Sequence, residues 1–405
     1  MRSETPRPRK PGVFNREGLP IIGTFLIWGT GSGAQTLARP LFAYDVAGSV
    51  FLVTVLIAAL AAGRMVSGPL TGYLADHWGR KPMAVAGAAI RGTASTLVIF
   101  TDNYAQFFVL EFVGAIGVSM WQTTSQVIVA DMSTPETRGR AVATRNTTLR
   151  MGQILGPMLG GVVATIWGLQ AVFLINAVSK YVVMVVTWRM VKETRPEPTS
   201  RRPKADAKPA VSMRSIMASR AFMALAITTI AVTMMNQGVF MTLFPIVAGE
   251  EGGLDAATIG TLVGFASFIT LLVSFPNGVL VDRYGRKRSL VAGLLLAAVA
   301  GVLLGLIVDF RTAVQAAAVF GVAQAMMMGA NMAFAMDLAP EDRRGAFLGV
   351  WSSVQSFGAL IGPLAVGAMV SIWGFTLAFN VVAVFMVGAA LVMALLGPET
   401  KGRAK

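Results

Sequence analysis

Cysteine is absent from the 405-residue chain, and histidine occurs only once, as His77. Disulfide bonds, thiolate metal sites and cysteine nucleophiles are therefore excluded, and a histidine-based catalytic triad or metal cluster is not expected. Charge is also scarce, because Asp, Glu, Lys and Arg make up 13% of the residues, against roughly 25% in soluble domains. A chain this long needs polar surfaces for two or three soluble domains, so we predict that it is not a soluble enzyme and uses no cofactor.

Long apolar segments are what the chain does contain. Hydrophobic residues make up 55% of it, and the mean hydropathy is +0.65. Segments close to the ~20 residues that span a bilayer occur twelve times, at 19–43, 47–71, 83–101, 104–130, 141–166, 169–190, 217–247, 256–281, 290–309, 312–336, 345–372 and 375–396. In hydrocarbon the backbone must satisfy its own hydrogen bonds, so we expect an all-α membrane protein with twelve transmembrane helices.

The net charge is +14, and most of the basic residues lie in the tails and in the connections between these segments. Of the 34 Lys and Arg residues, 26 lie in the two tails and in alternate connections, while the other connections carry mainly acidic residues. The positive-inside rule then predicts that both termini and the long 191–216 connection are cytoplasmic, in the plasma membrane or bacterial inner membrane. Because the basic residues are spread over separate loops, nucleic-acid binding is not predicted.

A repeat divides the chain into two halves. The sequence GYLADHWGRK at 72–81 returns as GVLVDRYGRK at 278–287, 206 residues later, and the same offset relates Asp131 to Asp337 (337 − 131 = 206). Parallel six-helix repeats are one known transporter architecture. We therefore predict a tail, a six-helix bundle, a linker, a second six-helix bundle and a tail, at 1–18, 19–190, 191–216, 217–396 and 397–405.

The two repeated blocks resemble the signature loop of the major facilitator superfamily, and the resemblance covers nearly the whole chain. It implies two pseudo-symmetric bundles, alternating access and a cytoplasmic latch that holds the bundles together in one state. Static, topology-setting charge is the alternative. The predicted latch residues are Gly72, Asp76, Gly79, Arg80, Asp131, Arg138, Gly278, Asp282, Gly285, Arg286 and Asp337.

The fifth predicted helix is similar to the motif that marks the antiporters of this superfamily, chiefly drug/proton exporters. Its residues are Gly152, Gly156, Pro157, Gly160 and Gly161. Glycine lets helices approach closely and proline bends a helix, so this helix is expected to seal against the opposite half. Ordinary tight packing is the alternative.

Ionisable residues at membrane depth are costly and mark functional sites by default. In this sequence they fall in the first half, at Arg64, Arg91, Glu111, Arg145, Arg150 and Lys180. Glu111 stands where proton-coupled relatives usually carry Arg, and it is the one acid well inside a predicted span. It is either the proton carrier or a structural partner of Arg91 or Lys180. Arg145 is expected to be interfacial.

The resemblance implies that the first, fourth, seventh and tenth helices line a central cavity. Each carries polar or aromatic residues at helical spacing. Together with two arginines of the first half, the predicted lining is Trp28, Ser32, Gln35, Arg39, Arg64, Gln122, Arg150, Asn236, Gln237, Phe240, Met327 and Asn331. Methionines concentrate on the seventh and tenth helices and suit an adaptable apolar surface, although Met is also common filler in membranes.

These features favour a monomeric secondary transporter that exports a lipophilic or amphipathic small molecule in exchange for protons. The excess of Arg and Lys in the first half keeps a second interpretation open, a symporter or uniporter for an anionic metabolite. A lipid flippase on the same scaffold is a third.

Overall fold

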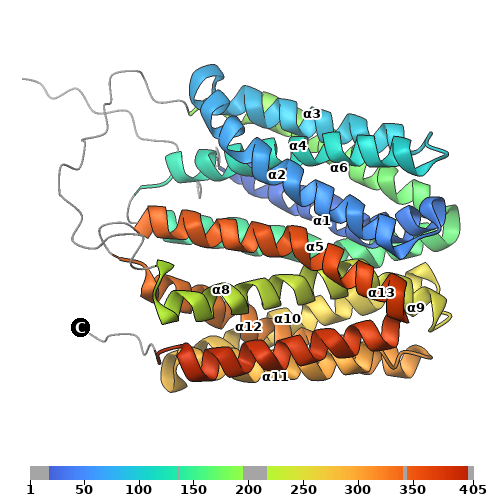
Figure 1. The fold of residues 1–405 in the computed structure, drawn as a ribbon. Coiled ribbons are helices and arrows are strands. Elements are labelled where there is room, and N and C mark those ends of the chain that lie inside the picture. Colours follow the sequence, from blue (N-terminus) through green and yellow to red (C-terminus); the bar gives the residue numbers. More distant parts are fainter. Residues whose placement is uncertain (1–17, 135–136, 195–216, 341–343, 400–405) are drawn as a thin grey trace, which may run out of the picture.

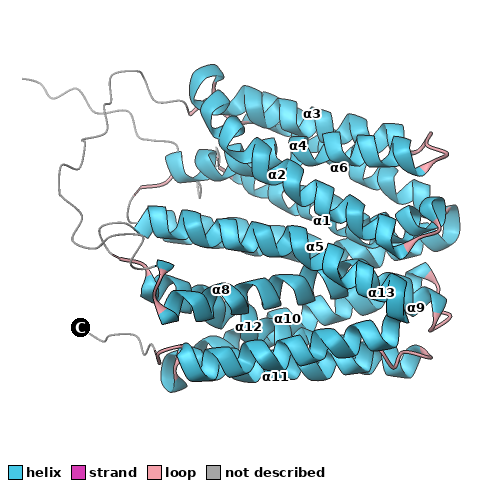
Figure 2. Ribbon diagram, in the orientation of Figure 1, coloured by secondary structure: helices cyan, strands magenta, loops and turns pink. Residues whose placement is uncertain are grey.

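The computed structural model describes residues 18–134, 137–194, 217–340 and 344–399, and all regular structure within them is helical (Figure 2). The predicted tails 1–18 and 397–405 and the linker 191–216 therefore lie mostly outside the described residues. The first half contains α1 (Leu19–Ala47), α2 (Val50–Trp78), α3 (Arg80–Val98), α4 (Tyr104–Asp131), α5 (Arg138–Trp167) and α6 (Leu169–Met190).

The second half repeats this plan (Figure 1). Its elements are α8 (Arg220–Thr233), η1 (Met234–Leu243), α9 (Phe244–Glu250), α10 (Ala256–Tyr284), α11 (Arg286–Leu304), α12 (Phe310–Leu338) and α13 (Arg344–Leu396). The segments α8, η1 and α9 follow one another as a single pass, and α13 is two passes joined at Gly374, where φ is 77°. The described residues thus form the twelve predicted passes.

Hydropathy agrees with a membrane environment. Nine helices of the described chain are long and apolar enough to cross a bilayer, and one of these, over Phe347–Leu396, holds two passes. The more polar helices α1 and α3 are not among the nine. Packing inside the protein explains this, because α1 and α3 bury polar side chains such as Gln35 and Arg91.

Turns between helices depend on glycines that adopt positive φ, which other residues rarely do. Gly79 and Gly285 separate α2 from α3 and α10 from α11, with φ of 105° and 101°. The predicted spans 47–71 and 256–281 end too early, because 72–78 lies in α2 and 282–284 lies in α10. Polar helix ends project beyond the apolar segment, so hydropathy alone ends these helices too early.

The seventh pass departs from α-helical winding. Over η1 the backbone is a π-helix, and the Thr242 hydroxyl donates to the Gln237 carbonyl five residues back, at 2.6 Å. Pro245 follows near the start of α9 and cannot donate a backbone hydrogen bond to the preceding turn. π-Helical turns are frequent at functional sites, and this one carries Asn236 and Gln237.

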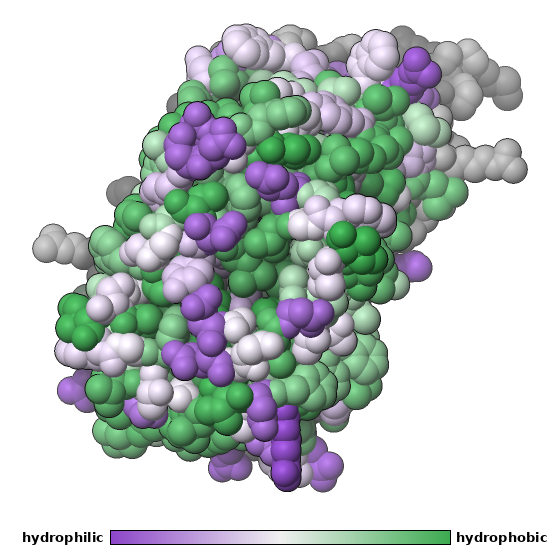
Figure 3. Space-filling model, turned by 90° about the vertical axis from the view of Figure 1, so that its right-hand side faces the viewer, coloured by the Kyte–Doolittle hydropathy of each residue, from purple (hydrophilic) through white to green (hydrophobic). Residues whose placement is uncertain are grey.

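The two halves close against each other at one end of the molecule. We call the end where α1 begins and α6 ends the terminal face and the other end the opposite face; Figure 3 looks onto the latter, where hydrophilic and hydrophobic groups are mixed. Contacts between the halves are made chiefly by α5 with α10 and by α2 with α13. The Ala257 N–H also donates to the Thr165 hydroxyl at 3.0 Å, at the ends of these helices on the opposite face.

Glycines let the backbones touch in this seal. A Cβ on Gly161 would lie 2.5 Å from the Ala256 carbonyl oxygen and 3.2 Å from the Gly260 Cα, and one on Gly367 would collide with Thr54. The two contacts are related by the repeat, because 161 + 206 = 367 and 54 + 206 = 260. The seal is therefore built twice, once from each half.

The other glycines of α5 have a different partner. A Cβ on Gly152 or Gly156 would collide with the α1 backbone at Leu26 or Thr30, and one on Gly160 would meet Ala34 at 2.9 Å. These three glycines therefore pack α5 against α1 within the first half. Both expected roles occur in this helix: Gly161 touches the opposite half, as does the Pro157 carbonyl through its approach to Gly260, while the other three glycines serve ordinary tight packing.

We predict that valine at Gly152 and at Gly161 will have different effects. Gly152→Val overpacks a helix pair inside one half and should lower the free energy of unfolding by about 1–3 kcal/mol, seen as a lower Tm. Gly161→Val should leave each half folded and part the seal instead. An Ala257→Cys reporter, in a chain without other cysteines, should then react several times faster with a maleimide. Equal losses of Tm with unchanged labelling would contradict this assignment.

Candidate functional site

A cavity lies between the two halves. It consists of two chambers of about 1040 and 590 Å³ that share the lining residues Arg64, Arg150, Gln237 and Met328. The larger chamber is lined by the parts of α5 and α13 nearer the terminal face, and the smaller lies deeper, between α1 and α10. Because the halves are sealed at the opposite face, the cavity is reached from the terminal face.

Most of the predicted lining residues meet in this cavity. Ten of the twelve line one or both chambers: Trp28, Ser32, Gln35, Arg39, Arg64, Gln122, Arg150, Asn236, Gln237 and Asn331. They come from α1, α2, α4, α5, η1 and α12, so both halves contribute. The walls also include exposed methionines, among them Met65, Met328 and Met332. The cavity therefore offers amide groups, cations and adaptable apolar surface together.

The two remaining predictions, Phe240 and Met327, are wrong. Phe240 is completely buried and stacks on Phe320 and Phe244, with ring centroids 3.8 and 4.8 Å away. Met327 is also completely buried and packs against Gly293 of α11. Neither residue is among the described residues that line the cavity. Both serve packing within the second half.

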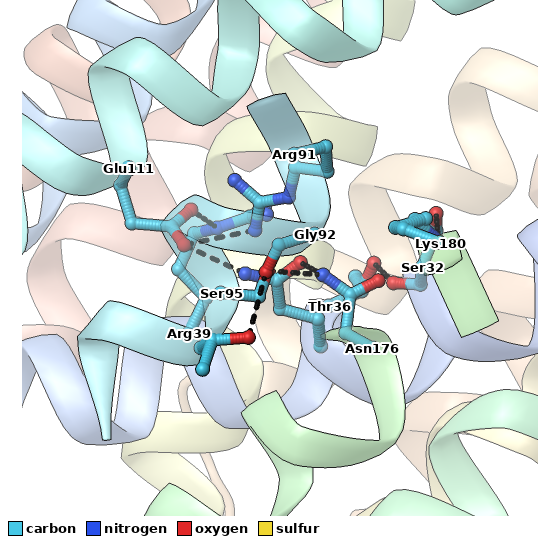
Figure 4. Close-up of polar contacts among 11 residues, drawn as sticks. Ser32, Thr36, Arg39, Arg91, Gly92, Ser95, Glu111, Asn176 and Lys180 are labelled. Atoms are coloured by element: carbon cyan, nitrogen blue, oxygen red, sulfur yellow. Dashed lines mark hydrogen bonds and ion pairs between the residues drawn. The ribbon is translucent and has the colours of Figure 1, made fainter. Parts of the chain in front are cut away.

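Glu111 forms the centre of a buried polar cluster (Figure 4). Its carboxylate is fully buried and accepts three hydrogen bonds: from Arg39 Nε at 2.7 Å, from an Arg91 guanidinium nitrogen at 2.9 Å and from Gln35 Nε2 at 2.7 Å. These partners come from α1 and α3, so the carboxylate on α4 joins three helices. Hydrogen-bonded, paired charges are the form in which a buried carboxylate is tolerated.

The cluster explains a glycine one turn further along α4. A Cβ on Gly114 would collide with the Arg91 guanidinium, so glycine leaves the space that this arginine occupies. Gln35 extends the network, because its Oε1 accepts from Asn176 Nδ2 at 2.5 Å, and Asn176 also donates to Ser95 at 2.8 Å. The arrangement fixes Arg91 firmly, whereas Arg39 retains 20% side-chain exposure toward the cavity.

Lys180 is buried separately from this acid. Its ammonium donates to the Trp28 carbonyl at 3.0 Å, to Ser32 Oγ at 3.0 Å and to Ser179 Oγ at 3.2 Å, and lies 4.3 Å from the Trp28 ring centroid. Trp28 in turn stacks on Trp121, with centroids 3.8 Å apart. Of the two predicted partners of Glu111, Arg91 is therefore correct and Lys180 is wrong, while Arg39 was not predicted as a partner.

Arg145, which was expected to be interfacial, lies in the part of α5 nearer the terminal face. Its side chain is buried, with the guanidinium 5.3 Å from the Phe25 ring centroid and a hydrogen bond of 3.0 Å to Asn146 Oδ1. Burial raises the cost of charging this group, so its pairing with an aromatic face has structural importance. It is not one of the cavity-lining arginines.

At the terminal face each half has an arginine–carboxylate pair. Arg80 pairs with Asp131, and Arg286 Nε lies 3.0 Å from Asp337 Oδ2. Asp282 lies 3.4 Å from Arg286 but its side chain is 77% exposed. These pairs join the third to the fourth helix of each half, so they lie within the halves and do not connect them.

Two glutamates accept hydrogen bonds from backbone N–H groups at the starts of α3 and α11. Glu193 accepts from the backbone N–H of Arg80 at 3.0 Å and of Lys81 at 3.1 Å, and Glu399 accepts from the N–H of Lys287 at 3.2 Å. Each caps a helix N-terminus, where a carboxylate is favoured. Sequence reasoning missed both, although the repeat relates them, since 193 + 206 = 399.

The rest of the predicted latch is exposed at the terminal face. Asp76 and Arg138 are exposed, and a Cβ on Gly72 or Gly278 would meet no atom within 4 Å. Asp76 makes no ion pair with a described residue. This carboxylate is thus free to contact another part of the protein when the halves come together at this face.

Comparison with known proteins agrees with the geometry. The sequence profile of the Major Facilitator Superfamily matches residues 21–252 and 226–405. The chain is 29% identical over 353 residues to "Multidrug resistance protein MdtG" of Dickeya zeae (strain Ech586), covering 85% of this chain and 81% of the relative. It is 24% identical over 339 residues to "Multidrug resistance protein MdtL" of Klebsiella pneumoniae, with 83% of each chain covered.

Solved structures show the same fold at low identity. A bacterial homologue of the human lysosomal transporter Spinster, inward-facing and unoccupied, superposes with a TM-score of 0.76 at 15% identity, with 94% of each chain covered. A D-xylose–proton symporter gives 0.76 at 17% identity, covering 96% of this chain and 99% of the other. The profile match spans nearly all of the described helices, and the chain belongs to the Major Facilitator Superfamily.

Proposed function

We propose that the protein exports lipophilic or amphipathic small molecules from the cytoplasm in exchange for protons, by alternating access. The names of its relatives support a multidrug-type transporter. The cavity supports a broad specificity, because exposed methionines, which adapt to different apolar shapes, line it together with amide side chains. With cytoplasmic termini in a bacterial inner membrane, the open terminal face is where substrate enters from the cell.

The single observation that carries proton coupling is the position of Glu111. It is the one buried carboxylate of the described residues, and it is held by one fixed arginine, Arg91, and one that reaches the cavity, Arg39. Displacement of Arg39 by substrate or by movement of the halves removes half of the compensating charge. The carboxylate then becomes a proton acceptor, which links cavity occupancy to proton uptake.

We predict that Glu111→Gln abolishes coupling while leaving the substrate cavity in place. The amide keeps the shape of the side chain but cannot carry a proton. In proteoliposomes with internal pyranine, movement of 1-N-phenylnaphthylamine by the unaltered protein should be accompanied by proton counterflow. Glu111→Gln should reduce this counterflow by at least tenfold.

Glu111→Asp is the matched control, because it keeps the carboxylate and should retain part of the counterflow. Removing one partner of a buried ion pair also costs about 3–5 kcal/mol, so rates are compared per folded molecule by size-exclusion and Tm measurements. Full counterflow in Glu111→Gln would exclude this residue as the carrier and leave it a structural partner of the arginines.

We further propose that Asp76 is the latch of the terminal face. The exposed carboxylate lies at the end of α2, the helix that packs against α13 across the halves. α13 begins at the same face, and the N-terminus of a helix attracts a carboxylate. When the cavity closes on this side, Asp76 can contact that end of the second half and hold the closed state.

The latch predicts a population shift in Asp76→Asn. Loss of the closed-state contact should increase the share of molecules open at the terminal face. A Gln355→Cys reporter in the cavity wall should then react faster with a membrane-impermeant maleimide added on that side, and turnover should fall several-fold. Asp282→Asn, at the position related by the repeat, is the control and should have the smaller effect, since Asp282 already contacts Arg286. Unchanged labelling and turnover in Asp76→Asn would rule out the latch.

A further inference from the structure

The described charged side chains that line the cavity are all positive. Its lining includes four arginines, Arg39, Arg64, Arg91 and Arg150, and no Asp or Glu among the described residues. The nearest acid, Glu111, is completely buried behind this wall and already accepts from two of the four. The cavity therefore carries uncompensated positive charge.

Two of these arginines face the cavity without a carboxylate partner. Arg64 on α2 and Arg150 on α5 are exposed to the space between the halves and make no ion pair with a described residue. The Arg150 side chain donates one hydrogen bond to a described residue, to Met328 Sδ of the second half at 3.4 Å. Thioether sulfur is a weak acceptor, so this guanidinium keeps most of its donors for a ligand.

The second half supplies an apolar and amide wall across from them. Met328 and Met332 are exposed into the larger chamber, and the amide side chains of Asn236, Gln237 and Gln324 also line it. Gln324 Oε1 is buried and has no hydrogen-bond partner among the described groups. Its amide can present either end to a ligand. A molecule with one anionic end and one apolar body matches both walls.

From this arrangement we infer the substrate class: an amphipathic organic anion of drug size, with its carboxylate, sulfonate or phosphate between Arg64 and Arg150 and its apolar body against Met328 and Met332. The inference rests on the proposed export function and specifies its substrate. Paired guanidinium forks match the planar oxygens of such groups. A lipophilic cation lacks any exposed carboxylate in the cavity to pair with.

Three naphthalene compounds with the same ring and different charge test the inference: 1-naphthaleneacetate, 1-naphthaleneacetamide and 1-naphthylmethylamine. Binding to the full-length protein in phosphatidylcholine nanodiscs is measured calorimetrically, with empty nanodiscs as the blank. We expect the anion to bind at least tenfold more tightly than the amine, with the amide between them. Equal affinities, or preference for the amine, would overturn the proposed substrate class.

Variants test which arginines bind the anion. Arg64→Gln/Arg150→Gln should weaken binding of the anion about tenfold and leave the affinity for the amide unchanged. Arg311→Gln should change neither, because Arg311 is an exposed arginine in the first turn of α12, outside the cavity lining. If the affinity for 1-naphthaleneacetate were unchanged in Arg64→Gln/Arg150→Gln, the assignment of the anion to these two arginines would be overturned. No proton gradient is present, so a failure here is separate from a failure of coupling through Glu111.

A further arm separates a free anion from a lipid headgroup. Nanodiscs that contain phosphatidylglycerol present the same anionic chemistry within the membrane. Unchanged affinity for 1-naphthaleneacetate in these discs would assign the site to free amphipathic anions, as we propose. Competition by phosphatidylglycerol that disappears in Arg64→Gln/Arg150→Gln would overturn the drug-sized ligand in favour of a lipid.

Discussion

Contact between helix backbones at the opposite face is the constraint on which the rest of the structure depends. At Gly161 with Gly260, and again at Gly367 with Thr54, the two halves come close enough that an added side chain would collide. Such close contacts leave no room for water between the helices. They close one end of the space between the halves and leave the other end open. The cavity and its access from the terminal face follow from this closure.

The first half concentrates its charge behind and around the cavity, while the second half presents methionines and amides. This asymmetry separates two tasks. Arg91, Glu111 and Asn176 belong to one hydrogen-bonded network that holds α1, α3, α4 and α6 in one arrangement. Arg64 and Arg150 lie outside that network and stay open to a ligand. The first half therefore holds both the charges that are fixed in the buried network and the two arginines that can bind a ligand at the cavity surface.

The architecture was predictable because it depends on patterns that repeat along the chain. Apolar segments gave the twelve passes, and the 206-residue offset gave the paired glycine turns at Gly79 and Gly285. Ends of helices were less predictable, since α2 continues through Asp76 after hydropathy has fallen. Glu193 and Glu399 could have been found, because Glu193-Thr194 and Glu399-Thr400 follow the same offset.

The site was harder to predict because it depends on contacts between distant residues. Arg39 and Glu111 are 72 positions apart, and nothing in the spacing of either helix pairs them. Phe240 was placed in the cavity by assuming 3.6 residues per turn, but it lies in the π-helical η1, where that assumption fails. Met327 and Met328 are equivalent by composition, and only packing against Gly293 decides which one is buried. These choices are made by tertiary packing and not by local sequence.

The glutamates that cap α3 and α11 have a consequence for how the molecule can move. Glu193 follows α6 and Glu399 follows α13, so the last residues of each half are bound to the first turn of that half's own third helix. The last residues of a half cannot separate from its third helix without breaking these hydrogen bonds. Each half is thus braced between its last residues and its third helix, so it can move as one rigid body.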